Sequence, residues 1–129
     1  HQAVSNTHDL AKAPTVELED LREERLMVRT YCETTQTLLD LLRGQQFDVG
    51  RFHEVSAESD LVSLLEAGFG VAFVPGSAPC PESVTRVTVT GVELERTIYL
   101  YGVAGRQRTA VASSMMKMLR GYDWTKHFA

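Results

Sequence analysis

The feature of this sequence that most constrains its fold is the alternation, from Leu18 onward, of short apolar runs with segments of helical periodicity. Continuous apolar runs at 26–28 and 71–74 are typical of strands that are covered on both faces. The segments 34–44 and 56–68 instead repeat leucines at the spacing of an amphipathic helix. Strands that alternate with helices predict an α/β fold with a mostly parallel sheet flanked by helices.

Four further elements follow from the same patterns. The segment 51–55 predicts a strand, and 84–90, in which valines alternate with polar residues, predicts a strand with one exposed face. The segment 97–103 is apolar on both faces and predicts a further strand. A final helix is expected at about 108–120, with an apolar stripe that consists of Val111, Met115, Met118 and Leu119.

Length and composition exclude several classes of protein. The 129 residues suffice for one domain, and 43% hydrophobic with 23% charged residues is typical of a globular chain. A formal net charge of -4 argues against a chain that grips the phosphate backbone of nucleic acid by itself. The sequence has no apolar run long enough for a membrane helix and no secretory signal pattern at its start. We therefore expect no membrane contact. Cys32 and Cys80 favour a reducing compartment, so we expect a cytoplasmic protein.

Two predicted helix starts carry polar side chains at the place where ligands bind in open parallel sheets, the carboxyl ends of the strands. The first helix start includes Thr30, Cys32, Thr34 and Thr35, and the second follows Ser56. Hydroxyl groups beside the free backbone N–H groups of a helix start suit a carboxylate or a phosphate. The simpler alternative is that Thr34 and Ser56 only cap their helices, because caps favour these residue types in general.

Motifs for catalysis or cofactor binding are absent from the sequence. It contains no G-x-S-x-G elbow, no H-E-x-x-H and no phosphate-binding glycine loop. The absence of these motifs leads us to expect no enzyme activity and no cofactor. The four histidines show no metal-ligand spacing, so we also expect no metal. One alternative stays open, in which Cys32 near a helix start is a reactive thiol and Cys80 is its disulfide partner.

Three passages, taken in order, resemble the LysR-type transcriptional regulators. His-Asp-Leu-Ala at 8–11 with Val-Glu-Leu-Glu-Asp-Leu at 16–21 is similar to the family's H-P-L-A and V-S-L-E-D-L passage. The glycine-containing stretch at 64–75 looks like the family's V-A-A-G-L-G-V-A-L-L-P signature. The segments 96–100 and 105–106 resemble its returning strand and the start of its last helix. The likeness runs from about residue 4 to residue 121.

The resemblance implies one lobe of a fold like the type II periplasmic binding proteins, in which two α/β lobes hold a small molecule between them. The chain is then a partial effector-binding domain. Residues of about 16–90 would form lobe two, and 95–121 would be the strand and helix that return to lobe one. DNA would be bound only through an N-terminal helix-turn-helix that this sequence does not include.

Carried over by position, the resemblance also implies two sets of functional residues. The effector, a small molecule and in our hypothesis a carboxylate, would contact Thr30, Cys32, Thr34, Thr35 and Ser56, with Val74, Pro75 and Gly76 as a wall. The family's dimers use a lobe-two helix such as 34–44, so self-association is expected through Leu38, Leu41, Leu42 and Gln45.

The leading hypothesis is therefore a non-enzymatic, effector-sensing part of a transcription regulator. Two alternatives belong to other classes. One is a solute-binding protein of a transporter, which has the same lobe architecture and would require export. The other is a thiol redox sensor, which would require a linkage between Cys32 and Cys80.

Overall fold

The computed structural model describes residues 1–128 of the chain. The chain divides into two compact units, residues 1–95 and residues 96–129. The first unit contains the sheet and both core clusters. The second contains two helices and, among its described residues, no strand. All the predicted effector residues lie in the first unit.

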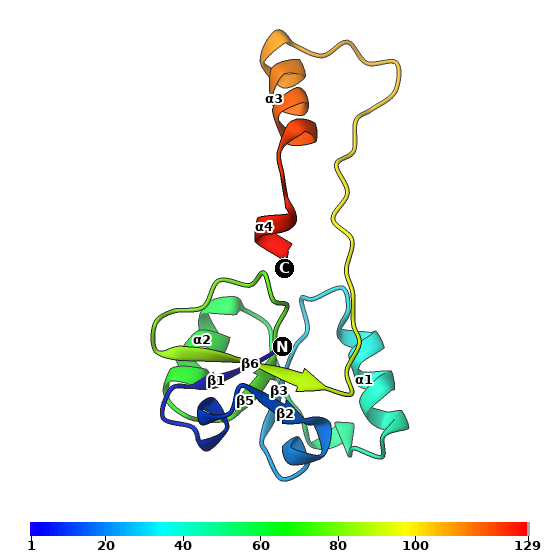
Figure 1. Cartoon of the computed structure of the whole chain (residues 1–129). Helices are drawn as coiled ribbons and strands as arrows, with labels where there is room; N and C mark the ends of the chain where they lie inside the picture. Colours follow the sequence, from blue (N-terminus) through cyan, green and yellow to red (C-terminus); the bar gives the residue numbers. More distant parts are fainter. Residues whose placement is uncertain (129) are drawn as a thin grey trace. The chain divides into compact units, whose positions relative to one another are not determined.

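The first unit is built on a six-stranded sheet with the order β2-β6-β1-β5-β3-β4 (Figure 1). β1 pairs antiparallel with its two neighbours, β5 and β6. The other pairings are parallel, so five strands run one way and the predicted mostly parallel sheet is confirmed. The strands are Gln2–Ser5 (β1), Thr15–Glu17 (β2), Leu26–Arg29 (β3), His53–Val55 (β4), Val71–Phe73 (β5) and Val84–Thr90 (β6).

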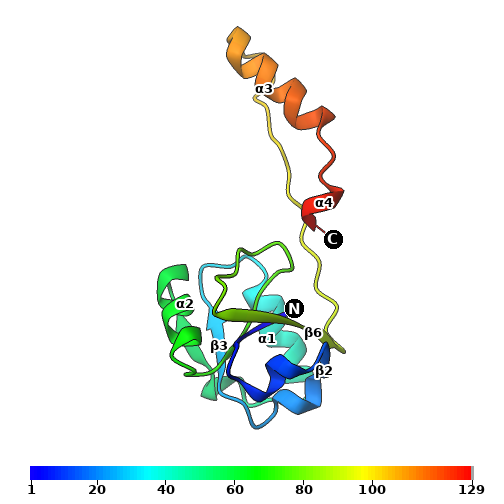
Figure 2. The ribbon, with the colours of Figure 1, turned by 60° about the vertical axis from the view of Figure 1, so that its left-hand side comes forward.

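Helices cover both faces of this sheet (Figure 2). α1 (Thr35–Gly44) buries Leu38 and Leu42, which belong to one hydrophobic cluster, the α1 cluster. α2 (Glu58–Glu66) buries Leu61 and Leu65, which belong to a second cluster, the α2 cluster. The clusters lie on opposite faces because successive side chains of a strand point in opposite directions. In β3, for example, Leu26 belongs to the α1 cluster and Met27 to the α2 cluster. Three 3₁₀ turns complete the unit, Asp9–Lys12 (η1), Leu18–Leu21 (η2) and Val49–Arg51 (η3).

One central strand, β1, was not expected from the sequence. Only Ala3 and Val4 among its four residues are apolar, so periodicity gives it little signal. Its position is set by its partners, since Ala3 lies opposite both Ala72 and Arg86 in the register of the neighbouring strands. Ala3 and Val4 are fully buried and face different clusters, which fixes β1 between the two helical layers.

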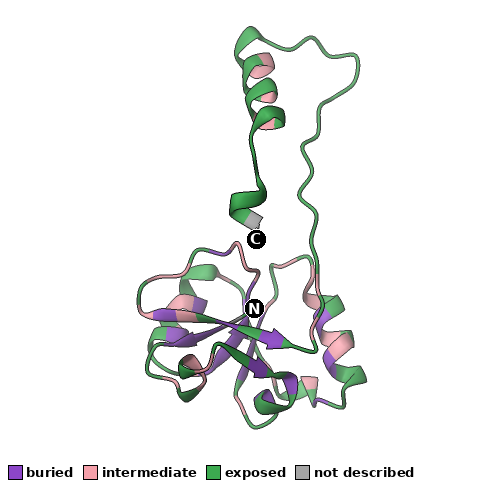
Figure 3. Ribbon diagram, in the orientation of Figure 1, coloured by how far each residue is buried: buried purple, intermediate pink, exposed green. Residues whose placement is uncertain are grey.

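The strand that the sequence predicted at 97–103 is not formed, and this corrects that prediction. The segment has no ladder partner, and it is exposed along its whole length (Figure 3). Ile98 and Tyr101 are 63% and 83% exposed. A strand that is apolar on both faces needs neighbouring strands and a covering layer. The described residues of the second unit provide neither.

The last predicted helix is present as α3 (Ala110–Gly121), followed by the short α4 (Thr125–Phe128). Thr109 caps α3, because its side chain accepts a hydrogen bond from the backbone N–H of Ala112 at 3.2 Å. The predicted apolar stripe lies along this helix, but its residues are exposed except for the half-buried Leu119. The second unit thus presents an apolar helix face without a core of its own.

Candidate functional site

The polar residues that the sequence proposed for effector binding lie at one edge of the sheet, where β5, β3 and β4 end side by side. β3 lies between β4 and β5 and is parallel to both strands. Thr30 follows β3 directly, and its backbone N–H and its Oγ1 both donate to the carbonyl of Val55, at 3.0 and 3.3 Å. Because Val55 ends β4 and Ser56 follows it, the two predicted helix starts adjoin each other.

The loop between β3 and α1 folds back on the end of its own strand. The carbonyl of Arg29 accepts hydrogen bonds from the backbone N–H of Cys32, at 3.3 Å, and from the hydroxyl of Thr35. The Sγ of Cys32 lies 3.3 Å from the Oγ1 of Thr34. These contacts bring the four predicted residues of this loop, Thr30 included, together beside the end of β3.

The simpler assignment of two hydroxyls to helix capping is wrong. Thr34 occupies the N-cap position of α1, but its side chain makes no capping hydrogen bond. The N-cap of α2 is Ala57, so Ser56 lies one residue outside the helix. Ser56 is exposed and Thr34 is half-buried. Neither hydroxyl group is therefore occupied by a capping hydrogen bond.

α1 and α2 both begin at this edge. The first intrahelical hydrogen bonds run from the N–H of Leu38 to the carbonyl of Thr34, at 3.0 Å, and from the N–H of Leu61 to the carbonyl of Ala57, at 3.1 Å. Of the N–H groups before them, that of Thr35 donates to the carbonyl of Cys32 at 3.2 Å, and the others have no acceptor one turn back within their helix. These donors, together with the positive ends of two helix dipoles, favour a negatively charged ligand.

Three charged or ionisable side chains at this edge were not among the predicted effector residues. Arg29 is the last residue of β3, and its Nη1 lies 3.8 Å from the Oε2 of Glu58 in the first turn of α2. The same Oε2 accepts a hydrogen bond from the hydroxyl of Tyr31. Burial, followed by the hydrogen bond to Glu58 and its charge, raises the pKa of Tyr31 to about 12. The phenol therefore stays protonated and donates to Glu58 at neutral pH.

Pro75 and Gly76 follow the third strand of this edge, β5. The carbonyl of Pro75 accepts from the backbone N–H of Ala78 at 3.0 Å, which closes a turn. The carbonyl of Gly76 accepts from Nη1 of Arg86, whose guanidinium also reaches the carbonyl of Ala78 at 3.2 Å. The loop is thereby tied to β6. Burial also raises the pKa of the thiol of Cys80 in this loop.

The four residues assigned to a dimer interface are divided between the inside and the outside of α1. Leu38 and Leu42 are 7% and 0% exposed and pack in the core of their own chain, so they present no surface to a partner. Leu41 is half-buried and Gln45 is exposed. Any partner of α1 would therefore meet only the latter pair and their exposed neighbours.

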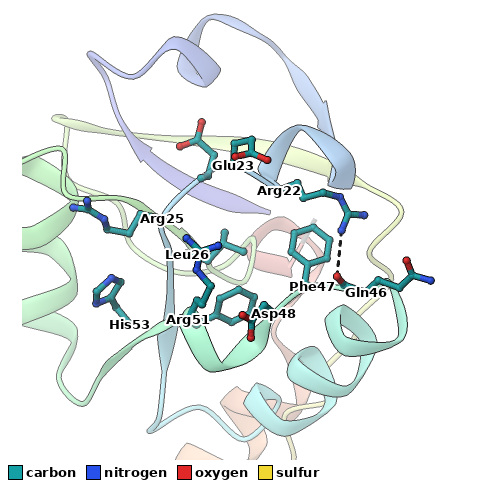
Figure 4. A pocket seen from close by; sticks show the side chains of 11 residues that line it. Arg22, Glu23, Arg25, Leu26, Gln46, Phe47, Asp48, Arg51 and His53 are labelled. Carbon is teal, nitrogen blue, oxygen red and sulfur yellow. Dashed lines mark hydrogen bonds between the residues drawn. The ribbon is translucent and has the colours of Figure 1, made fainter.

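A pocket of about 470 Å³ opens at the opposite ends of the strands (Figure 4). It lies around Leu26 and His53, the first residues of β3 and β4, and none of the predicted effector residues lines it. Arg22, which lines it, is held by Glu19 at 2.6 Å and stacks on Phe47 with its Cζ 4.5 Å from the ring centroid. Its lining includes three arginines, three carboxylates and one histidine, Arg22, Glu23, Glu24, Arg25, Asp48, Arg51 and His53. This mixture gives the pocket no single charge preference.

Residues 1–128 contain no group of three or more His, Cys, Asp and Glu side chains that could hold a metal ion. Cys32 and Cys80 are both free thiols. None of the helices in the described part of the chain combines the length and the apolar character that crossing a membrane would require.

Several solved structures are similar to this one. The effector-binding domain of QuiR in complex with shikimate matches with a TM-score of 0.68 at 18% identity, over 99% of this chain and 62% of that one. The regulatory domain of CcmR from Synechocystis PCC6803 in complex with 2-PG matches with a TM-score of 0.69 at 18% identity, over 92% and 59% of the two chains. The BenM effector-binding domain with benzoate gives 0.57 at 18% identity, over 69% and 43%.

These similarities show the fold, and the chain spans about three fifths of the length of the solved QuiR and CcmR domains. No curated protein sequence matches the chain. The model of the LysR substrate binding domain matches residues 2–123, which is nearly the whole sequence. The resemblance seen in the sequence is therefore confirmed, and the chain belongs to the LysR substrate binding domain family.

Proposed function

We propose that this chain is the effector-sensing lobe of a LysR-type transcriptional regulator and that it binds a small carboxylate at the carboxyl ends of β3, β4 and β5. DNA would be bound by a helix-turn-helix elsewhere in the same protein. The chain would perform no catalysis, and it would act in the cytoplasm, where a regulator meets DNA.

The observation that carries this proposal is the gathering of hydroxyls and helix starts at a single edge. Thr34 and Ser56 lie there without capping hydrogen bonds, and both helices begin at this same edge of the sheet. A carboxylate accepts hydrogen bonds only, so such a set of donors suits it. Shikimate and benzoate, which are bound by the similar domains of QuiR and BenM, are both carboxylates.

We also propose that residues of about 16–90 form lobe two and that 95–121 return to lobe one. The apolar residues of 98–103 and the stripe of α3 support this arrangement, because exposed apolar surface of this kind is typical of segments that dock on another structure. Self-association through the outer surface of α1, at Leu41 and Gln45, belongs to the same proposal.

The site can be tested by removing its hydroxyls in the full-length protein. Thr34→Ala and Ser56→Ala are each expected to weaken the binding of shikimate or benzoate about tenfold in calorimetric titration, since a hydrogen bond to a charged group contributes about 1.5–3 kcal/mol. Ser63→Ala is the matched control, because its hydroxyl bonds to the carbonyl of Ser59 within α2. Equal affinities for wild type, Thr34→Ala and Ser56→Ala would refute the site.

A further inference from the structure

Arg29 places a guanidinium at the effector edge, where it contacts the side chains of Tyr31, Cys32 and Glu58. Its side chain is only 11% exposed. Its Nη2 lies 3.5 Å from the Sγ of Cys32, and its Cζ lies 5.8 Å from the centroid of the Tyr31 ring. A guanidinium has five N–H donors, and a thiol sulfur is a weak acceptor. None of these contacts is a two-point hydrogen bond with a carboxylate, so the guanidinium keeps N–H donors for a ligand.

The carboxylate that pairs with Arg29 is held by a different residue. The Oε2 of Glu58 is 3.8 Å from Nη1 of Arg29, which is longer than the roughly 2.7–2.9 Å of a charge-assisted hydrogen bond. The same oxygen takes its hydrogen bond from the hydroxyl of Tyr31, and the Glu58 side chain is 44% exposed. Glu58 is therefore attracted to Arg29 without closing on it.

We propose that Arg29 anchors the carboxylate of the effector and that Glu58 is a built-in competitor, which the effector displaces from Arg29. This inference rests on the proposed function of the same edge. An effector carboxylate can form two parallel hydrogen bonds with a guanidinium, which Glu58 does not form at its present distance. The displaced Glu58 keeps its bond to Tyr31, so its negative charge is not left without a donor.

The competition also links occupancy of the site to the position of α2. Glu58 is the first residue of α2, whereas Arg29 and Tyr31 belong to β3 and to the loop that follows it. An effector on Arg29 removes one electrostatic attachment between the start of α2 and the end of β3. The same pair sets the specificity of the site, since a cationic ligand would have to use Glu58 and would be repelled by Arg29.

Calorimetric titration of the full-length protein with benzoate and with shikimate tests the proposal, with benzamide as a neutral analogue of benzoate and benzylamine as a cationic one. Glu58→Gln removes the competing charge and is expected to tighten carboxylate binding about three- to tenfold, while Arg29→Gln is expected to weaken it about tenfold or more. Benzamide should respond to neither change. Asp40→Asn is the matched control, because Asp40 pairs with Arg43 at 2.7 Å on the exposed face of α1.

A gain of affinity in Glu58→Gln cannot come from misfolding, so that variant keeps the test sharp even where Arg29→Gln is unstable. Unchanged or weaker carboxylate binding in Glu58→Gln overturns the proposal. So does binding of benzylamine in place of both carboxylates, or the failure of both carboxylates to bind at millimolar concentration. If Thr34→Ala and Ser56→Ala weaken binding while the Arg29 and Glu58 variants bind as wild type, the proposed site stands and this inference falls.

Discussion

Replacement of Gly70 by alanine should destabilise the fold strongly, because Gly70 lies where the backbones of β3 and β5 come together. A Cβ at this position would overlap the carbonyl oxygen of Arg25 and would lie 3.2 Å from its carbonyl carbon. That oxygen accepts the hydrogen bond from the N–H of Val71, at 3.0 Å, at the start of β5. The obstacle is backbone rather than a flexible side chain, so the strands have to separate.

The expected cost has two parts. Overpacking of a close contact costs about 1–3 kcal/mol, and weakening of the Val71 hydrogen bond adds about 1 kcal/mol, so the free energy of unfolding should fall by about 2–4 kcal/mol. Gly44→Ala is the matched control, because Gly44 lies in α1 and a Cβ there meets nothing within 4 Å. In this helical position alanine is expected to add about 0.5–1 kcal/mol.

Urea unfolding followed by circular dichroism measures both changes in the same chain, with the midpoint compared at constant slope. The two substitutions should shift the midpoint in opposite directions. A free energy of unfolding for Gly70→Ala within about 0.5 kcal/mol of wild type, the range that is ordinary for a surface substitution, would refute the close backbone contact at this position.

Three further predictions follow from burial and electrostatics. Leu61→Ala should lower the free energy of unfolding by about 2–5 kcal/mol in the same urea assay. Leu64→Ala, at a half-buried position of the same helix, should lower it clearly less. Equal losses would contradict the orientation of α2, in which Leu61 faces the sheet. Tyr31 should ionise near pH 12 in an ultraviolet phenolate titration, and Glu58→Gln should bring its pKa down part of the way towards 10. A wild-type transition near pH 10 would contradict the partly desolvated phenol with its hydrogen bond to Glu58. Because burial raises the pKa of Cys80 and the thiolate is the nucleophile, its alkylation by iodoacetamide should need a higher pH in the folded protein than in urea; identical pH profiles would show that the loop does not bury it.

The predictions that succeeded are those that short-range patterns control. The apolar runs at 26–28 and 71–74 became β3 and β5, because a strand that is covered on both faces needs apolar residues throughout. The leucines of 34–44 and 56–68 gave α1 and α2 for the corresponding reason. The proximity of Thr30 and Ser56 followed from parallel strand order alone, since neighbouring parallel strands end at the same edge.

The predictions that failed depend on partners that lie far away in the sequence. The segment 97–103 has strand composition, but a strand exists only when another strand pairs with it. β1 has little strand composition, yet it is central because β5 and β6 pair with it on both sides. In the sequence, Arg29 is only the polar end of an apolar run, and its proposed role depends on the fold, which places Glu58 beside it.

The surface of α1 could not be assigned from the sequence for a third reason. Helical periodicity identifies an apolar stripe but does not say whether the stripe faces the protein's own core or a partner. Leu38 and Leu42 belong to the core, although they were expected at an interface. The polar neighbours on the helix carry no signal that separates these two uses.

Amide hydrogen exchange of the full-length protein, with and without shikimate or benzoate, tests the location of the proposed effector site most directly. If the carboxylate binds at the ends of β3, β4 and β5, it should protect the amides of residues 30–37 and 56–60 from exchange. Protection confined to residues 46–53, which line the pocket at the other ends of the strands, would contradict the account.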